Sequence, residues 1–336
     1  MQHLKAWLAL PEETKKNAFA QTATKIGLPA YTVEKDWWVV QTLALLFTMD
    51  CKDHLIFKGG TSLSKGWDLI KRFSEDIDLA LDREFLGFKG ELNKTQIRNL
   101  RIKTYEYLSG PFMQELQRKF YETGFQGVTI KLKETNSKDQ DPIIEIYTPK
   151  FFDGEYLKPE VIVEVGTRSL KEPKTILPIC SWVGENFEGR PFADLPFSIP
   201  VVNPERTLLE KVFLLHEEFQ REPDKIRVNR MSRHLYDIEK LSHTEFAKVA
   251  LSDVELYQSI ISHREKFNTL NYVDYDLHKP ESIRFLPPET LLAAWKEDYK
   301  VMQVDMFYDS NGSLPFEELM ESLRKFQEQI NRIVLP

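Results

Sequence analysis

The stretch that most constrains the fold reads FKGGTSLSKGWDLIKRFSEDIDLAL and runs from Phe57 to Leu81. It begins as a strand and breaks at Gly59 and Gly60. It continues through TSLSKGWDLIKR, up to Arg72, with the apolar spacing of an amphipathic helix, and ends in the strand-like alternation DIDLAL. Asp76 and Asp78 interrupt this second strand. Carboxylates in an otherwise buried strand are unfavourable unless they bind something, so the stretch predicts a ligand site.

The spacing of the two aspartates indicates a metal ion. Residues two apart on a strand point to the same face, so Asp76 and Asp78 are expected side by side, with Ile77 and Leu79 on the core face. Two carboxylates this close raise each other's pKa unless a cation lies between them. Proteins hold Mg²⁺ with one or two carboxylates together with substrate phosphates. The alternative is a solvated edge strand on which the aspartates are merely tolerated.

The glycine turn before the helix predicts a phosphate site. Glycine lets the backbone turn tightly and lets a ligand approach it, and a helix N-terminus offers N–H groups and a positive dipole end. Thr61 and Ser62 add hydroxyl donors. The alternative is a simple turn with a Ser/Thr cap. We assign nucleotide binding to Gly59, Gly60, Thr61, Ser62 and Lys65.

A third acidic residue is expected on a neighbouring strand. In EVIVEVGTR, residues 160–168, the alternation places Glu164 on the face opposite to the valines that flank it. A charged group in such a position needs a partner, so Glu164 is a candidate third metal ligand. The alternative is an ion pair with Arg168 or with a lysine of another strand.

The rest of the chain indicates an α+β fold. Residues 1–50 have helical patterns, and the segments VTIKLKE, IIEIYTP and EVIVEVGTR alternate as strands, the first two forming a hairpin through a polar stretch at 135–142. Proline becomes frequent from Pro173 to Pro204, which suggests a linker-like crossing, and helices dominate afterwards. We expect an α+β domain over residues 1–200 and a helical domain over 201–336 that completes the active-site cleft.

The composition excludes several classes of protein. A net charge of −7 argues against a surface coated in positive potential, although a local basic patch can still bind nucleic acid. Cys51 and Cys180 lack metal-type spacing, which argues against a disulfide framework or a zinc site and fits a reducing cytoplasm. The N-terminus has no secretory pattern and no apolar run is long enough to span a bilayer, so we expect a cytoplasmic location and no membrane contact.

These motifs resemble a known family. A Gly-Gly-Thr-Ser turn, a helix and Asp76-x-Asp78 resemble the signature of the nucleotidyltransferase superfamily. The fuller string FKGGTSLSK…RFSEDIDL resembles the AbiEii/AbiGii-type nucleotidyltransferases, the toxins of type IV-like toxin–antitoxin and abortive-infection systems. Downstream, NPERTLLEKVFLLHE, RHLYDIEKL, WKEDYKVM and PFEELMESL resemble helices of that family, with His234 where an aspartate is common. The resemblance covers most of residues 31–330 and implies a mixed sheet flanked by helices, then a mostly helical C-terminal region.

The resemblance also implies site residues. Asp76 and Asp78 would be metal ligands, and Lys211 and Asp237 would belong to the same site. Lys211 is a candidate on its own account, because a helical lysine among leucines either extends its ammonium to water or points it into a site. For Asp237 the alternative is an ordinary surface network with Arg233 and Lys240 on one helix.

The local basic excess over residues 221–233, REPDKIRVNRMSR, suits a triphosphate or an RNA backbone, and a solvated loop is its alternative.

We therefore expect a metal-dependent nucleotidyltransferase that moves a nucleoside monophosphate from an NTP to an acceptor hydroxyl. Mg²⁺ or Mn²⁺ would be the cofactor, with a second ion shared with Glu164. The resemblance makes RNA, in particular the tRNA 3′ end, the leading acceptor and implies a possible cognate antitoxin. One alternative is the same chemistry on a small molecule or a protein hydroxyl. Another is a degraded transferase that serves as a partner-binding subunit.

Overall fold

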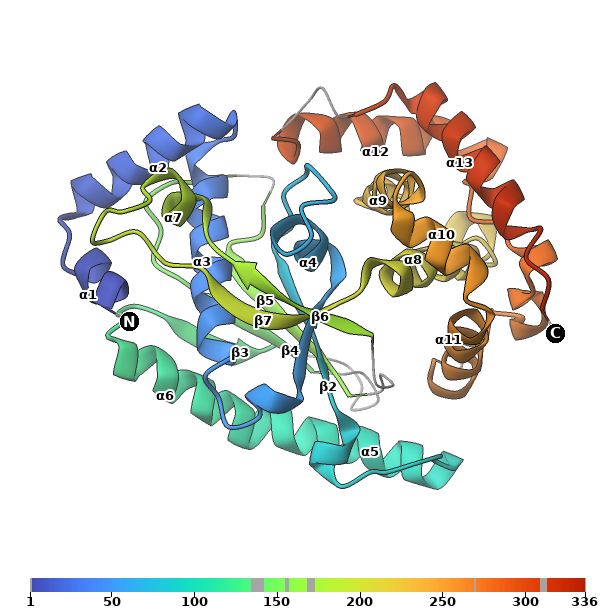
Figure 1. Cartoon of the computed structure of the whole chain (residues 1–336), viewed down its shortest axis with the longest axis horizontal. Coiled ribbons are helices and arrows are strands. Elements are labelled where there is room, and N and C mark those ends of the chain that lie inside the picture. The colour runs from blue at the N-terminus through green and yellow to red at the C-terminus, as the bar shows by residue number, and fades with distance from the viewer. Residues whose placement is uncertain are drawn as a thin grey trace. The chain divides into compact units, whose positions relative to one another are not determined.

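The computed structural model describes residues 2–133, 142–154, 157–167, 173–268, 270–308 and 313–335. They form two compact units. The first consists of Met1–Asp68 and Phe73–Val202, and the second of Leu69–Arg72 and Asn203–Pro336. Figure 1 shows the elements of the first unit in blue to yellow-green and those of the second in yellow to red.

The first unit is built on a seven-stranded sheet in the order β3-β4-β5-β2-β1-β7-β6. Its strands are β1 Leu55–Lys58, β2 Asp76–Leu81, β3 Thr129–Leu132, β4 Ile143–Tyr147, β5 Glu160–Gly166, β6 Lys174–Ile179 and β7 Phe197–Val202. The β2/β5 and β1/β7 pairs are parallel and the other pairs are antiparallel. The predicted mixed sheet is thus confirmed, as is the pairing of the first two downstream strands as β3 and β4, whose connection lies outside the described residues.

Seven helices of the described residues belong to this unit. They are α1 Gln2–Leu8, α2 Glu12–Ile26, α3 Ala30–Leu46, α4 Gly59–Lys65, α5 Lys94–Tyr107, α6 Met113–Thr123 and α7 Trp182–Asn186. Helix α3 packs on β2 and β5, and α4 packs on β1 and β2. Because α3 is apolar on nearly all sides, most of its length is buried, as the sequence predicts.

Two predictions about the chain path are wrong. The helix after the glycine turn was expected to reach Arg72, but α4 ends at Lys65, Asp68 follows with φ +52°, and Leu69–Arg72 joins the second unit. The proline-rich stretch is no linker, because residues 174–202 form β6, α7 and β7. Pro178 is tolerated because β6 is the edge strand of the sheet.

The second unit is helical, as predicted. Its helices are α8 Pro204–Glu218, α9 Ser232–Ser242, α10 Glu245–Ser252, α11 Val254–Phe267, α12 Leu292–Asp305 and α13 Phe316–Ile330. Pro204 occupies the first turn of α8 directly after Asn203, a position where proline is favoured. Helix α9 packs against α8, α12 and α13. None of the helices in the described part of the chain is both long and apolar enough to cross a membrane.

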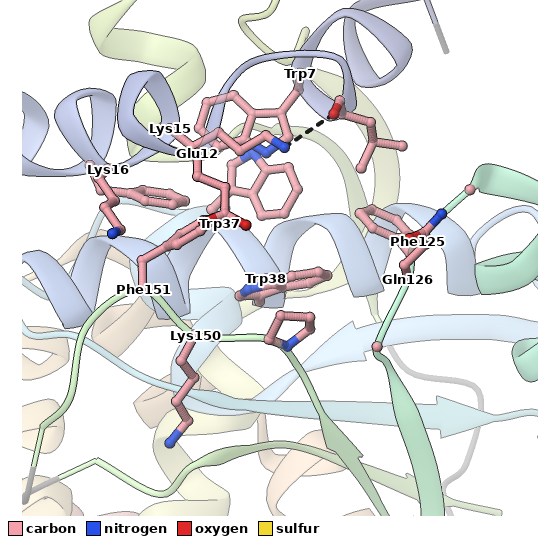
Figure 2. Close-up of a pocket in the computed structure, with 15 residues that line it drawn as sticks. Trp7, Glu12, Lys15, Lys16, Trp37, Trp38, Phe125, Gln126, Lys150 and Phe151 are labelled. Atoms are coloured by element: carbon pink, nitrogen blue, oxygen red, sulfur yellow. Dashed lines mark hydrogen bonds between the residues drawn. The ribbon is translucent and has the colours of Figure 1, made fainter.

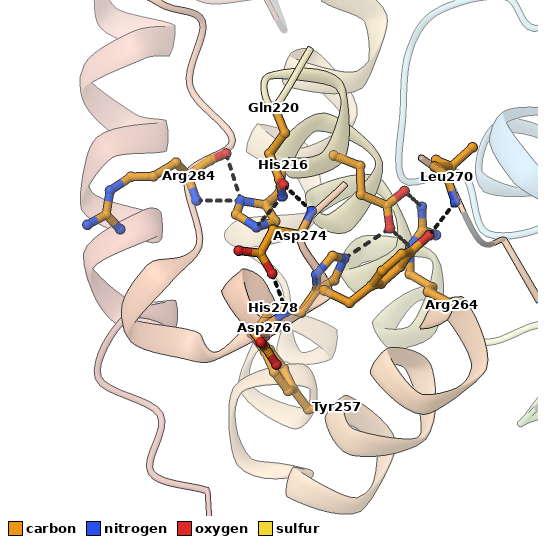
Figure 3. A network of polar contacts seen from close by, with 11 residues as sticks. His216, Gln220, Tyr257, Arg264, Leu270, Asp274, Asp276, His278 and Arg284 are labelled. Carbon is orange, nitrogen blue, oxygen red and sulfur yellow. Dashed lines mark hydrogen bonds and ion pairs between the residues drawn. The ribbon is translucent and has the colours of Figure 1, made fainter. Parts of the chain in front are cut away.

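A buried polar network ties α8 to later parts of the second unit (Figure 3). Glu217 forms a two-bond ion pair with Arg264 of α11 and accepts a hydrogen bond from His278 at 3.0 Å. The adjacent His216 lies 3.2 Å from Gln220 and accepts a hydrogen bond from the Arg284 N–H at 3.1 Å. The network supplies partners for polar groups that are otherwise costly to bury.

Candidate active site

The central strands β2 and β5 bring three carboxylates together. In the parallel register Asp78 lies directly opposite Glu164, and Asp76 lies opposite Ile162. Ile77 and Leu79 between them are fully buried, whereas Asp76 and Asp78 are half-buried. The predicted division of β2 into a core face and an acidic face is therefore confirmed.

Burial and the proximity of the three carboxylates raise the pKa of Glu164. Although water reaches its side chain, partial burial and the negative charges of Asp78 and Asp76 raise the pKa of Glu164 to about 7. Lys158 and Lys58 oppose that rise, and Lys58 stands directly opposite Asp78 on β1. Arg168, the ion-pair partner weighed for Glu164, lies outside the described residues.

The carboxylate set fits a divalent cation in part. Carboxylate oxygens are the ligands that Mg²⁺ prefers, and a cation would offset the repulsion that raises the pKa of Glu164. In the part of the chain that the structure describes, no three ligand-type side chains are already arranged around one metal position. Asp76 and Asp78 therefore suit an ion whose remaining ligands are water and phosphate, and Glu164 stays a predicted third ligand.

Gly59 adjoins the carboxylates through its backbone. It has φ +78°, and a Cβ there would lie 1.9 Å from Oδ2 of Asp78. Both the conformation and the contact exclude a side chain at this position. The first glycine of the turn thus makes room for Asp78, whereas the sequence explained it by a tight turn and the approach of a ligand.

The hydroxyl groups after the glycines are used inside the protein. Thr61 is buried, and its hydroxyl donates to the backbone carbonyl of Asp76 and lies 3.0 Å from the hydroxyl oxygen of Ser74. Ser62 is also buried and donates to the Gly59 carbonyl at 2.9 Å. These hydroxyls hold α4 to the start of β2, and their role as phosphate donors stays a prediction. Binding of a phosphate by Gly60 or by backbone N–H groups here stays a prediction.

Lys65 has a structural partner as well. Its Nζ lies 3.0 Å from Oδ1 of Asp36 on α3 and 4.7 Å from the ring centroid of Trp182, and its side chain is 7% exposed. Asp36 also accepts the Trp182 N–H at 2.9 Å. Lys65 therefore links α4, α3 and α7, and its contact with a nucleotide stays a prediction.

Lys35 of α3 is a neighbour of the carboxylates that sequence reasoning missed. Its Nζ donates to the carbonyls of Glu160 and Lys158 and lies 3.8 Å from Oε2 of Glu75. Burial lowers the pKa of Lys35 to about 8, against the opposing effect of Glu75 and Asp76. Lys35 lies in the helix TVEKDWW, whose apolar character signals burial but not the identity of its partners.

Lys211 and Asp237 meet within the second unit. Lys211 Nζ lies 2.9 Å from Oδ2 of Asp237. Arg72 donates two hydrogen bonds to the same carboxylate, of 2.7 and 2.6 Å. Asp237 is fully buried, so the surface network weighed for it is wrong. Burial alone would raise the pKa of Asp237, but Arg72 and Lys211 together hold it well below its usual value.

This cluster contains the two cations Arg72 and Lys211 and the one anion Asp237, so its net charge is positive. Lys211 is 8% exposed. His234 adds no charge, because burial and the nearby Lys211 and Arg233 lower its pKa well below the usual value. The Arg72 side chain was not predicted as part of the cluster, since it precedes Asp237 by 165 residues in the sequence.

The basic stretch over residues 221–233 is partly neutralised within the second unit. Arg221 and Arg227 both pair with Glu218, at 3.1 and 2.6 Å, and Lys225 pairs with Glu222 at 2.5 Å. For these three cations, the contacts favour the alternative interpretation of the stretch, a solvated loop, over binding of a phosphate.

The profile of a protein family described as Nucleotidyl transferase AbiEii toxin, Type IV TA system, matches residues 44–328. The chain belongs to the AbiEii nucleotidyltransferase family. It is therefore a nucleotidyltransferase of a toxin family of type IV toxin–antitoxin systems, and the resemblance read from the motifs is confirmed. The match spans β2, β5, α8 and α9, which carry the acidic and basic residues described above.

The chain is also similar to two solved structures. JHP933 from Helicobacter pylori is 14% identical, with a TM-score of 0.41 over 89% of this chain and 93% of that chain. A candidate nucleotidyltransferase from the same organism is 15% identical, with a TM-score of 0.42 over 88% of this chain and 93% of that chain. No curated protein sequence matches the chain.

Proposed function

We propose that this AbiEii-family protein transfers a nucleoside monophosphate from an NTP to a hydroxyl of RNA, with the tRNA 3′ end as the leading acceptor. The observation that carries the proposal is the register of β2 and β5, which sets Asp78 beside Glu164 and Asp76 one step along the same face. Family membership supplies the reaction class, and the RNA acceptor comes from the motif resemblance alone.

Each group has a chemical task in this proposal. The acceptor oxygen attacks the α-phosphorus, the bond from that phosphorus to the bridging oxygen breaks, pyrophosphate leaves, and the hydroxyl proton passes to water. A divalent cation held by Asp76 and Asp78 would, when bound, neutralise the triphosphate. Gly59 keeps the Asp78 carboxylate in place by leaving it room. On the motif resemblance, Lys211 would supply positive charge to departing pyrophosphate. Within the second unit, Asp237 with Arg72 fixes the position of Lys211.

The partner expected from the family is a cognate antitoxin, since the family description places these toxins in type IV systems. Inspection of the neighbouring gene tests this part of the proposal. A small upstream or downstream gene whose product suppresses the toxicity of this chain would support it, and growth arrest that no neighbouring product relieves would contradict it.

A transfer assay tests the reaction. The protein is incubated with each labelled NTP and total tRNA in the presence of Mg²⁺, and label in RNA is followed on denaturing gels. We expect one nucleotide to label tRNA with wild-type protein and none with Asp76→Asn. The control Asp53→Asn removes an exposed carboxylate outside the site and should retain activity.

Other outcomes of this assay identify the alternatives. Label in a small-alcohol or protein pool with none in RNA would replace the RNA acceptor while leaving the reaction class intact. Full activity of a folded Asp76→Asn protein would overturn the assignment of the acidic face. Calorimetry that detects no binding of Mg²⁺-NTP would favour the partner-binding alternative.

A further inference from the structure

A large cavity in the first unit lies outside the acidic face. It has a volume of about 710 Å³ and is bounded by α1, α2, α3, the chain before β3 and the chain after β4. Cavities that bind small molecules in proteins measure about 300–1,000 Å³. Figure 2 shows three tryptophans at its centre, with Phe125 on one side and Phe151 on the other.

Aromatic rings form much of the lining. Six of them contribute: Trp7, Phe19, Trp37, Trp38, Phe125 and Phe151. Trp7 stacks on Trp37 with centroids 4.9 Å apart, and Trp38 lies 5.0 Å from Trp37 and 5.2 Å from Phe125. These contacts make a rigid aromatic wall, and such walls favour planar ligands because bases stack on rings with little sequence preference.

The charges around the cavity are mostly positive. Lys15, Lys16 and Lys150 line it, against the single carboxylate of Glu12. Lys15 donates to the Leu8 carbonyl at 3.1 Å. Lys16 lies 6.0 Å from the ring centroid of Phe151 and 3.8 Å from the exposed carboxylate of Glu13. The exposed Lys150 extends its ammonium away from Trp7 in Figure 2. A purely apolar ligand would leave these lysines unused, and a phosphate alone would leave the aromatic wall unused.

A narrow cleft continues from this cavity toward the acidic face. It has a volume of about 30 Å³ and shares Trp38 and Lys150 with the larger cavity. Lys35 and Lys158 line it as well. Lys35 donates to the carbonyl of Glu160, the first residue of β5, so this cleft reaches the strand that carries Glu164. Lysines thus line the way from the aromatic wall to that strand.

We propose that the cavity binds a nucleotide, with its base against the aromatic wall and its phosphate at Lys150 and Lys16. Aromatic rings paired with lysines match the two halves of a nucleotide, a planar base and an anion. That the nucleotide belongs to the acceptor strand rests on the proposed function, whereas the binding itself does not. The cavity then holds RNA beside the acidic face and so contributes to the choice of acceptor.

Tryptophan fluorescence tests the binding directly, because three of the six tryptophans of the chain line the cavity. The full chain is titrated with AMP and with a short oligoadenylate in EDTA, so that no metal-dependent binding occurs at Asp76 and Asp78. We expect quenching with at least one probe. Lys150→Glu and Phe151→Ala should each raise Kd about tenfold, a loss typical of one phosphate or stacking contact.

Matched controls separate the cavity from general charge and aromatic effects. Lys89→Glu reverses the charge of another exposed lysine of the first unit, and Tyr121→Ala removes an exposed ring. Neither residue lines the cavity. Both should bind as wild type. Tighter binding of the oligonucleotide than of AMP assigns the cavity to a strand, and equal binding assigns it to a free nucleotide. Either result supports the nucleotide site.

Three results would overturn the inference: no quenching with either probe, equal Kd in wild type, Lys150→Glu and Phe151→Ala, or binding only of an acidic aromatic peptide in place of nucleotides. The assay also separates this inference from the proposed function. A protein that binds oligoadenylate but transfers no nucleotide loses only the proposed function. If no quenching is seen and the Lys150→Glu variant labels tRNA at the wild-type rate, only the cavity site is refuted and the proposed function stands.

Discussion

The carboxylate of Asp78 lies against the backbone of Gly59, so close that a methyl group on Gly59 would come within 1.9 Å of Oδ2. Ordinary contacts of a Cβ begin near 3.4 Å, so an alanine at this position would push one of the two groups by about 1.5 Å. The strand that carries Asp78 is central in the sheet and paired on both sides. The side chain of Asp78 is therefore the group that must move.

Gly59→Ala should consequently abolish most activity. A misplacement of about 1 Å in a catalytic group can cost roughly 100-fold in rate, and we expect a loss of at least that order in the tRNA-labelling assay. Gly27→Ala is the matched control, because Gly27 has φ +76° with nothing near its Cβ position. It should cost about 1–2 kcal/mol of unfolding free energy from backbone strain and leave the rate intact. Equal rates in the two variants would contradict the role given to Gly59.

Binding of Mg²⁺ should stabilise the protein through the acidic face. At a concentration ten times its Kd, a ligand that binds only the folded state adds about 1.4 kcal/mol. For a unit of this size that corresponds to a Tm rise of about 3 °C in a thermal melt. Asp76→Asn should lose the rise, and Asp53→Asn should keep it. An identical rise in both variants would place the ion elsewhere.

The local parts of the acidic site were predictable from sequence because they depend on strand geometry. The two-residue period puts Asp76 and Asp78 on one face, and the same period selects Glu164 in the valine-rich strand. The register that makes Asp78 and Glu164 neighbours pairs residues that are 86 positions apart in sequence (164 − 78 = 86). No local pattern fixes such a register, so the sequence could name the three acids but not their pairing.

The contacts that the sequence did not predict share one physical cause, which is the pairing of polar groups over long sequence distances. Lys65 looked available for a nucleotide because its partner Asp36 lies on another helix. Thr61 looked like a phosphate donor because the carbonyl that it bonds lies on β2. The surface interpretation of Asp237 considered only neighbours on its own helix, whereas Arg72 comes from a segment 165 residues earlier. Burial of polar groups requires such partners, but the sequence does not say which.

Removal of Asp237 should destabilise the second unit far more than removal of Lys211. Asp237→Ala leaves Arg72 and Lys211 as buried cations without their carboxylate, a change that costs about 3–5 kcal/mol. Lys211→Met leaves the two-bond pair between Arg72 and Asp237 in place, so its cost should stay near 1 kcal/mol. Urea unfolding of the two variants measures the difference.

Activity gives a second readout for the same pair of variants. Lys211→Met should remain folded and lose nucleotide transfer, because the ammonium that suits pyrophosphate is gone. A Lys211→Met protein with wild-type rates would remove Lys211 from the mechanism while leaving the structural role of Asp237 untouched. Equal unfolding free energies for the two variants would contradict the ion-pair argument itself.

The second unit should lose stability in mild acid because of His216. Burial and the nearby His278 lower the pKa of His216 to about 4 in the folded chain, against 6.5 for an unperturbed histidine. The unfolded chain therefore takes up this proton first as the pH falls. The contribution of His216 is complete above pH 6.5, declines between pH 6.5 and 4, and amounts to roughly 3 kcal/mol across that window.

Urea unfolding across this pH range tests the histidine, and His216→Gln is the informative variant. Its amide can still accept a hydrogen bond but takes up no proton, so the free energy of unfolding should fall less steeply between pH 6.5 and 4 than in wild type. His243→Gln replaces an exposed histidine of the same unit and should keep the wild-type slope. Glu217 is adjacent to His216 in the sequence. Burial alone would raise the pKa of Glu217, but Arg264 and His278 together lower it. Glu217 therefore reduces the free energy of unfolding only as the pH falls below the usual glutamate range. A slope unchanged by His216→Gln would therefore mean that the folded chain admits a protonated imidazole at the position drawn in Figure 3.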